Sequence, residues 1–131
     1  MKIICTYCSK EKSTEIKPIP AIKRYRSNRI HHLHEISKKR AIPFYILSGK
    51  FGLISATESI ANYDHLLKYS EVKSHAELIK NQIQNEKITA IEYYTLDVAD
   101  QPNLKPYLAC IQKAMNFNKI TITLIDESFN D

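Results

Sequence analysis

The 131-residue chain contains only two glycines, Gly49 and Gly52. Their number and spacing fit neither a phosphate-binding loop nor a dinucleotide-binding fingerprint, and the Gly-x-Ser-x-Gly elbow of many hydrolases is missing too. No apolar run approaches the roughly 20 residues that cross a bilayer, and the amino terminus lacks the apolar core of a secretory signal. We therefore expect a cytoplasmic protein that makes no contact with a membrane.

The cysteines are few and odd in number: Cys5, Cys8 and Cys110. An odd count favours free thiols in a reducing compartment over a disulfide framework. Cys5 and Cys8 have the spacing of a redox or zinc motif. A zinc site would normally need a second Cys or His pair, and none accompanies them. The redox motif opens a helix, whereas a loop is expected after Cys8. His31 and Glu35 have the spacing of a helical metal pair, although neighbouring histidines indicate a histidine-rich helix surface instead. We predict no metal site and no cofactor.

What is present is an ordinary globular composition, with 44% hydrophobic and 25% charged residues. The length favours a single domain over residues 1–131. The net charge is +5, and positive residues crowd the first third, at Lys10, Lys12, Lys17, Lys23, Arg24, Arg26, Arg29, Lys38, Lys39 and Arg40. This asymmetry favours a polyanionic partner such as a nucleotide or nucleic acid, and the alternative is a solvated basic helix face.

Hydrophobic periodicity predicts strands that alternate with helices. Strands are expected over residues 2–6, 44–48, 88–96 and 120–125. Helices are expected from Ser27 or Asn28 to Arg40, from a capping box that opens at Ser74, and from Asn103 or Lys105 onward. This alternation predicts an α/β fold of three layers, with a mainly parallel sheet of about four strands and helices on both faces.

Two segments do not fit this alternation. Residues 13–27 contain Pro18 and Pro20, which predict an extended excursion across the surface. Residues 49–73 form a long polar connection, and long connections inside a compact domain are usually functional. We therefore expect residues 49–73 to form a site loop.

Three polar clusters follow the first two predicted strands, so we expect them to meet at the carboxyl edge of the sheet, where parallel α/β folds bind ligands. The clusters are Cys8, Ser9, Lys10 and Lys12; Tyr25 and Ser27; and Ser48, Gly49, Lys50 and Gly52 with Tyr63 and Asp64. In such a site lysines hold phosphate, a tyrosine stacks on a base, and a carboxylate accepts hydrogen bonds from a base or ribose.

The clusters, in this order, resemble the bacterial and phage DUF6884-type proteins. That family usually shows Cys-Ser-x-x-Lys, Leu-Tyr-x-Ser, Leu-Ser-Ala-Lys-Tyr-Gly-Leu and Pro-Tyr-Asp. The corresponding residues here are Cys8 to Lys12, Tyr25 to Ser27, Leu47 to Leu53, and Tyr63-Asp64. More distantly, the chain is similar to the YaaA peroxide-stress proteins, which are DNA-binding, and to the catalytic module of archaeosine synthase, which modifies a deazaguanine base in tRNA.

The archaeosine synthase signature places a nucleophilic lysine four residues after a cysteine. Cys8 and Lys12 keep this spacing, so the resemblance makes Lys12 the candidate catalytic lysine. The match is looser at Tyr7, Ser13 and Thr14, which stand where that signature has Pro and Pro-Tyr. The resemblance as a whole implies a nucleotide or nucleic-acid site without naming a reaction.

The sequence thus predicts a protein that binds a nucleotide, nucleobase or nucleic acid in a cleft at the carboxyl ends of the first two strands. A catalytic form would perform nucleobase-modifying or glycosidic-bond chemistry, with Lys12 as nucleophile or electrostatic stabiliser and Asp64 as orienter or base. One alternative is a non-catalytic DNA-binding stress or defence protein. Another is an interaction protein that binds a partner through the helix from His31 to Arg40. The substrate and the oligomeric state stay open.

Overall fold

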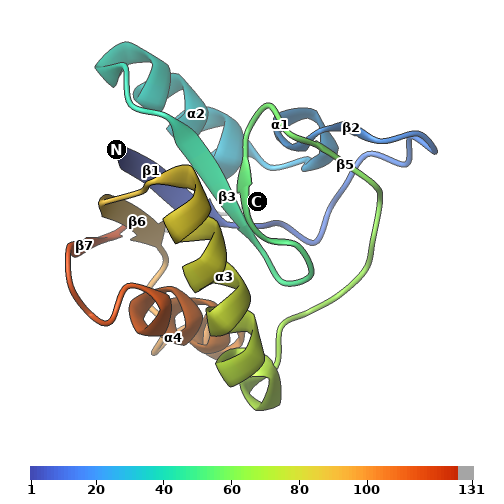
Figure 1. The fold of residues 1–131 in the computed structure, drawn as a ribbon. Helices are drawn as coiled ribbons and strands as arrows, with labels where there is room; N and C mark the ends of the chain where they lie inside the picture. The colour runs from blue at the N-terminus through green and yellow to red at the C-terminus, as the bar shows by residue number, and fades with distance from the viewer. Residues whose placement is uncertain (127–131) are drawn as a thin grey trace.

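A computed structural model describes residues 1–126, and Figure 1 shows a sheet with helices on both sides. The strands are β1 (Lys2–Tyr7), β2 (Ile19–Pro20), β3 (Phe44–Ser48), β4 (Gly52–Ser55), β5 (Ser59–Ile60), β6 (Ala90–Thr95) and β7 (Ile120–Leu124). The α-helices are α1 (Ala21–Arg24), α2 (Asn28–Arg40), α3 (Val72–Glu86) and α4 (Lys105–Ala114), and short 3-10 turns, η1 (Tyr69–Glu71) and η2 (Pro102–Leu104), precede α3 and α4.

The main sheet has five strands in the order β4-β3-β1-β6-β7. β1 pairs in parallel with both β3 and β6, and β6 pairs in parallel with β7. The predicted α/β class, with a mainly parallel sheet and helices on both faces, is confirmed. The predicted strand count is corrected from about four to five, because the edge strand β4 pairs antiparallel with β3.

β4 lies inside the segment that we expected to be a site loop. The backbone turns at Gly52, which has a φ of 77°, a conformation that glycine adopts at little cost. Leu53 and Ile54 then face opposite sides of the sheet, and both are buried, in different core clusters. The chain therefore forms a hairpin here because Leu53 and Ile54 each pack into one of the two hydrophobic cores.

The sheet separates two hydrophobic cores. On one face, Ile79 and Ile83 of α3 and Ile111 of α4 pack against side chains from β1, β3 and β6. On the other face, Ile30 and Leu33 of α2 pack against β1 and β3 together with α1 and β5. The two clusters make the three layers that the alternating pattern predicts.

Two of the three predicted helix starts are correct and one is wrong; α4 begins at Lys105, as expected. Ser27 caps α2, since its Oγ accepts the Ile30 N–H at 3.0 Å. α3 begins at Val72 and not at Ser74, whose hydroxyl donates to the Glu71 carbonyl from within the first turn. The Glu71 carboxylate accepts the Lys68 N–H at 2.9 Å, so the start of this helical segment depends on Glu71.

Hydrogen bonds from a buried arginine fix the path of residues 13–27 on the domain. Arg24 is fully buried and donates hydrogen bonds to four backbone carbonyls, those of Ser13, Glu15, Lys17 and Ile60. Residues predicted as extended also form β2 and α1, with β2 pairing antiparallel with β5. As for membranes, none of the helices formed by residues 1–126 has the length and apolar character needed to cross one.

Candidate functional site

The loop after β1 is fixed at the carboxyl edge of the sheet. The Cys8 N–H donates to the Leu47 carbonyl of β3 at 2.9 Å, which extends the strand pairing by one residue. The Ser9 hydroxyl donates to the Glu11 carbonyl at 2.8 Å, and Lys12 forms an isolated antiparallel bridge with Tyr25. These contacts give residues 8–12 a defined path beside the strand end.

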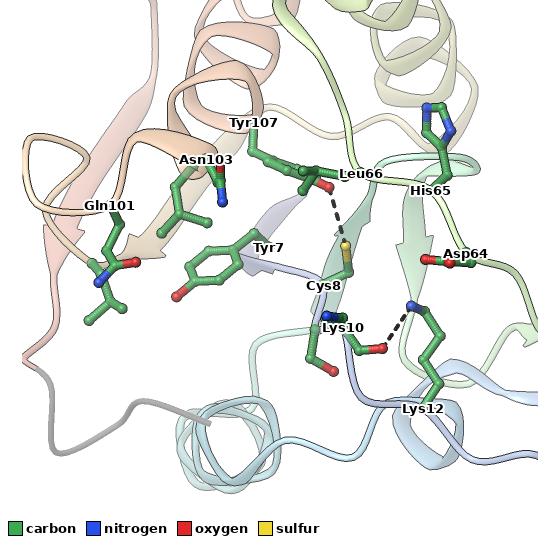
Figure 2. A pocket seen from close by; sticks show the side chains of 13 residues that line it. Tyr7, Cys8, Lys10, Lys12, Asp64, His65, Leu66, Gln101, Asn103 and Tyr107 are labelled. Atoms are coloured by element: carbon green, nitrogen blue, oxygen red, sulfur yellow. Dashed lines mark hydrogen bonds between the residues drawn. The ribbon is translucent and has the colours of Figure 1, made fainter.

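A cavity of about 380 Å³ opens at this edge. Its walls come from the loop after β1, the segment 64–66 and the connection between β6 and α4. The lining residues are Tyr7, Cys8, Ser9, Lys10, Lys12, Asp64, His65, Leu66, Leu96, Gln101, Asn103, Leu104 and Tyr107. Figure 2 shows Lys12 and Asp64 at one end and Gln101 and Asn103 at the other. The cavity therefore has a charged end and an amide end.

Lys12 is held at the charged end by three contacts. Its Nζ lies 4.6 Å from the centre of the Tyr63 ring and 5.9 Å from that of the Tyr25 ring. It also donates a hydrogen bond to the Lys10 carbonyl at 3.1 Å, drawn as a dashed line in Figure 2. An ammonium group binds to aromatic faces and donates to carbonyl oxygens, so these contacts fix its position.

Behind Lys12, three hydroxyls form a buried chain. The Tyr25 and Tyr63 hydroxyls lie 2.5 Å apart, and the Ser48 Oγ donates to the Tyr63 hydroxyl at 2.9 Å. Burial, followed by the effect of nearby Cys8, raises the pKa of both tyrosines far above the ordinary value. These phenols therefore stay neutral and support the Lys12 site from inside the protein.

Tyr107 of α4 joins the cavity walls to one another. Its hydroxyl accepts the Leu67 N–H at 3.1 Å, and the Cys8 thiol donates to it at 3.9 Å. A Cβ on Gly49 would lie 2.8 Å from this hydroxyl and 3.0 Å from the His65 carbonyl oxygen. A side chain at position 49 would therefore crowd both Tyr107 and the backbone of residues 65–67.

Arg29 of α2 supports the end of β1, where Tyr7 joins the cavity lining. It is buried, and its guanidinium donates to the Thr6 Oγ1 at 2.7 Å and to the Tyr7 carbonyl at 2.9 Å. Its Cζ lies 3.7 Å from the centre of the Tyr7 ring. This arginine, which sequence reasoning grouped with the basic surface, instead holds the end of β1 in place.

The predicted site residues fall into three groups. Five line the cavity: Cys8, Ser9, Lys10, Lys12 and Asp64. Four are buried behind or beside it: Tyr25, Ser48, Gly49 and Tyr63. Three lie outside its lining: Ser27, Lys50 and Gly52. The structure therefore brings the first cluster and Asp64 together around one space and separates them from most of the third cluster.

Four of the predicted ligand-binding residues lie outside the cavity lining and have other contacts. Tyr25 is fully buried, so no face of its ring is open to a base. Ser27 caps α2, and Gly52 packs against Gln82, whose Oε1 would lie 2.5 Å from an added Cβ. Lys50 is exposed, with its Nζ 5.4 Å from the centre of the Phe51 ring.

Sequence reasoning missed the half of the cavity that follows β6. Gln101, Asn103, Leu104 and Tyr107 come from this region, together with Leu96. The available signal was the short connection between the third predicted strand, residues 88–96, and the next predicted helix, which begins at Asn103 or Lys105. Because β6 pairs in parallel with β1, the ends of both strands meet at one edge.

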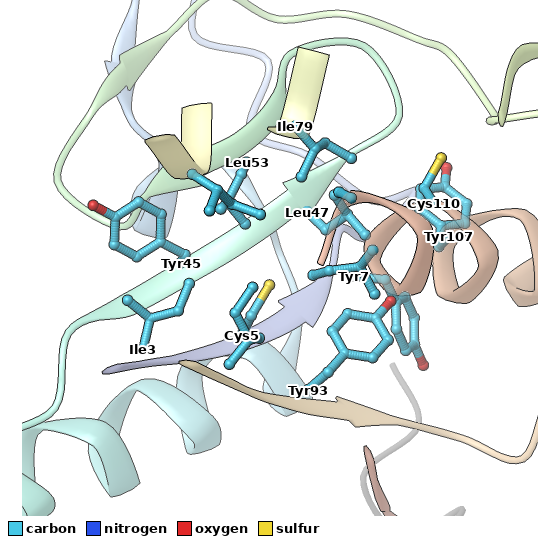
Figure 3. Packing of buried hydrophobic residues seen from close by; sticks show 14 of the residues in the cluster. Ile3, Cys5, Tyr7, Tyr45, Leu47, Leu53, Ile79, Tyr93, Tyr107 and Cys110 are labelled. Atoms are coloured by element: carbon cyan, nitrogen blue, oxygen red, sulfur yellow. The ribbon is translucent and has the colours of Figure 1, made fainter. Parts of the chain in front are cut away.

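The cysteines differ in environment. Cys5 and Cys110 are buried in the core shown in Figure 3. Burial raises the pKa of the Cys110 thiol to about 12 and that of Cys5 further still. Cys8 is half-buried in the cavity wall, so Cys5 and Cys8 do not form an accessible dithiol. Within residues 1–126, no group of three or more His, Cys, Asp or Glu side chains is arranged to hold a metal ion.

Fold and site together define a three-layer α/β protein with a polar cavity at the carboxyl edge of its parallel strands. The chain belongs to DUF6884, a family of unknown function, whose family model matches residues 3–100. The predicted resemblance to this family is confirmed. Comparisons with curated proteins and with solved structures find no match.

Proposed function

We propose that the protein binds a nucleotide or nucleobase in the cavity at the ends of β1 and β6. The observation that carries this proposal is the division of the cavity into a cationic end, with Lys10 and Lys12, and an amide end, with Gln101 and Asn103. Lysines bind phosphate as point charges. Amide groups offer both donors and acceptors, which the polar edge of a base requires.

The wall of the cavity also offers apolar surface. Tyr7, Leu96 and Leu104 contribute apolar surface to the wall, and small-molecule sites typically combine such surface with a few placed polar groups. The volume of about 380 Å³ lies in the lower part of the range that ligand pockets occupy. This favours one nucleotide unit over a large cofactor.

A catalytic form of the protein would modify a nucleobase or cleave a glycosidic bond, as the likeness to archaeosine synthase suggests. The contacts of the Lys12 Nζ with the Tyr63 ring and the Lys10 carbonyl support an electrostatic role for this lysine over a nucleophilic one, because a nucleophile must first lose its proton. Asp64 is exposed at the cavity wall and is the group available as base or orienter.

The rival proposal, suggested by the YaaA-like resemblance, is a non-catalytic DNA-binding protein. Lys23 and Arg26 support it, since both are exposed near the start of α2. The basic surface is smaller than the sequence indicates, however. Arg24 and Arg29 are buried, and Arg40 forms a two-pronged ion pair with Glu92.

Two measurements test the proposal. A thermal-shift screen of nucleotides, nucleobases and deazapurines should raise the Tm with at least one compound, because a ligand that binds only the folded state stabilises it. Calorimetric titration of that compound should show at least about tenfold weaker binding to Lys12→Ala and unchanged binding to the control Lys80→Ala on the exposed surface of α3. Equal affinity in both variants would refute a ligand at Lys12.

The salt dependence of binding distinguishes the nucleotide-binding proposal from the DNA-binding alternative. Affinity for a DNA duplex that falls steeply with salt, together with no response to any mononucleotide, would favour the DNA-binding protein, since each neutralised phosphate releases counterions. A single nucleotide in the cavity should show a much weaker dependence.

A further inference from the structure

We infer that the cavity selects a nucleoside monophosphate over the corresponding diphosphate and triphosphate, and that Asp64 enforces this selection. The inference rests on the proposed function and deepens it, because it names the ligand class of the same site. It depends on the balance of charge at one end of the cavity and on the way in which each charged group is held.

Two lysines and one carboxylate contribute charge to the cavity wall. Lys10, Lys12 and Asp64 all line the cavity, and Figure 2 shows the Asp64 carboxylate on the Lys12 side of the space. Within residues 1–126, none of these three side chains forms an ion pair. Their charges therefore act on a ligand directly, and the net surplus is a single positive charge.

One lysine has little freedom to follow a longer phosphate chain. The Lys12 Nζ is held by the Tyr63 ring and the Lys10 carbonyl, and the tyrosine is itself fixed by Ser48. Lys10 is exposed and can swing toward a phosphate. The site thus offers one fixed and one adjustable cation, which suits a single phosphate group.

A second or third phosphate would meet no further cation among the described lining residues. His65 is the remaining basic side chain in the wall, and its Nε2 is 2.9 Å from the Glu71 carboxylate. Because like charges at short range repel, each added phosphate should meet the Asp64 carboxylate with no further cation in the described lining to compensate it.

Asp64 can also contribute favourably to a monophosphate. A carboxylate accepts hydrogen bonds from neighbouring hydroxyls, so Asp64 beside a phosphate-binding lysine is placed to accept from the ribose. The same residue would then orient the sugar and exclude a longer phosphate chain.

The test titrates a nucleoside and its mono-, di- and triphosphates, all carrying the base found in the thermal-shift screen, into wild type, Asp64→Asn and Glu77→Gln. Glu77 is exposed on α3 away from the cavity lining, so its variant makes the matched change of charge. Wild type and Glu77→Gln should bind the monophosphate at least about fivefold more tightly than the triphosphate at low salt. Asp64→Asn should reduce that ratio to about twofold or less.

Each other outcome has a distinct meaning. A triphosphate that binds wild type as tightly as the monophosphate overturns the inference while the proposed function stands. A preference for the monophosphate that Asp64→Asn leaves unchanged overturns the assignment to Asp64. Failure of all four ligands to bind, or an affinity that Lys12→Ala leaves unchanged, refutes the proposed function itself.

Discussion

The turns that follow β1 and β3 lie side by side at one edge of the sheet, and both are rich in polar residues, yet they have different roles. The first, residues 8–12, directs Cys8, Lys10 and Lys12 into the cavity wall. In the second turn, residues 48–52, the Ser48 hydroxyl forms hydrogen bonds that stabilise the fold. The Ser48 Oγ alone accepts the backbone N–H groups of Lys50 and Phe51 and donates to Tyr63.

This difference teaches that a Ser-Gly-Lys turn at the carboxyl edge of a sheet is not by itself a binding loop. Backbone groups in a tight turn need partners, and a small hydroxyl at the start of the turn supplies them. Gln82 of α3 completes the arrangement, because its side chain accepts the Leu53 N–H and donates to the Phe51 carbonyl. The second turn thus supports the walls of the cavity that the first turn lines.

Gly49→Ala should cause the largest loss of stability among changes to the second turn. The new Cβ would lie 2.8 Å from the Tyr107 hydroxyl and 3.2 Å from the Leu67 nitrogen, so we expect the free energy of unfolding to fall by about 2–3 kcal/mol. Urea denaturation measures this loss. Tyr107→Phe in the same chain should recover part of it, and a Gly49→Ala protein of wild-type stability would show that the close approach is not maintained in solution.

Ser48→Ala should destabilise the protein by about 2 kcal/mol, because it leaves two partly buried backbone donors and the buried Tyr63 hydroxyl without their shared partner. The control is Ser70→Ala, at an exposed position in η1, whose denaturation midpoint should match that of wild type. Equal midpoints for both variants would mean that the second turn does not depend on the serine.

Lys12→Ala, in the first turn, should reduce ligand affinity more than it reduces stability. Losing a charge-assisted contact to phosphate should weaken nucleotide affinity by at least about tenfold. The loss of its contact with the Tyr63 ring should lower stability by only about 0.5–1 kcal/mol. Calorimetry and denaturation on the same sample measure the two quantities, and a variant with a large loss of stability and unchanged affinity would place Lys12 in the fold instead of the site.

Lys50→Ala should have the smallest effect. The side chain is exposed and lies outside the cavity lining, so we expect changes within about 0.5 kcal/mol in stability and no change in affinity. Sequence reasoning alone predicts that Lys50 binds the ligand, and a loss of affinity as large as that of Lys12→Ala would restore that prediction.

Much of the fold follows from local sequence signals. Buried runs and helical spacing predict strand 44–48 and the helix from Asn28 to Arg40, including its Ser27 cap. β4 was missed because Gly49 and Gly52 bracket a polar turn, so the two apolar residues after it read as part of a loop. Its pairing with β3 depends on contacts to both cores, and no local pattern reports these.

The candidate site was only half predictable for a related reason. Cys8, Lys10 and Lys12 follow a clear strand, and their position at the sheet edge can be inferred from chain order. Gln101 and Tyr107 enter the cavity because β6 lies beside β1. That neighbourhood is a property of sheet order, which brings together segments about ninety residues apart.

The most direct test of the central claim maps the ligand by NMR. Adding the nucleoside monophosphate from the screen to ¹⁵N-labelled protein should shift most strongly the backbone amides of residues 8–12 and 101–107 together with the Asp64 amide. The amides of residues 50–52 should move little. Large shifts over residues 50–52, with residues 8–12 unchanged, would contradict the account and return the site to the turn after β3.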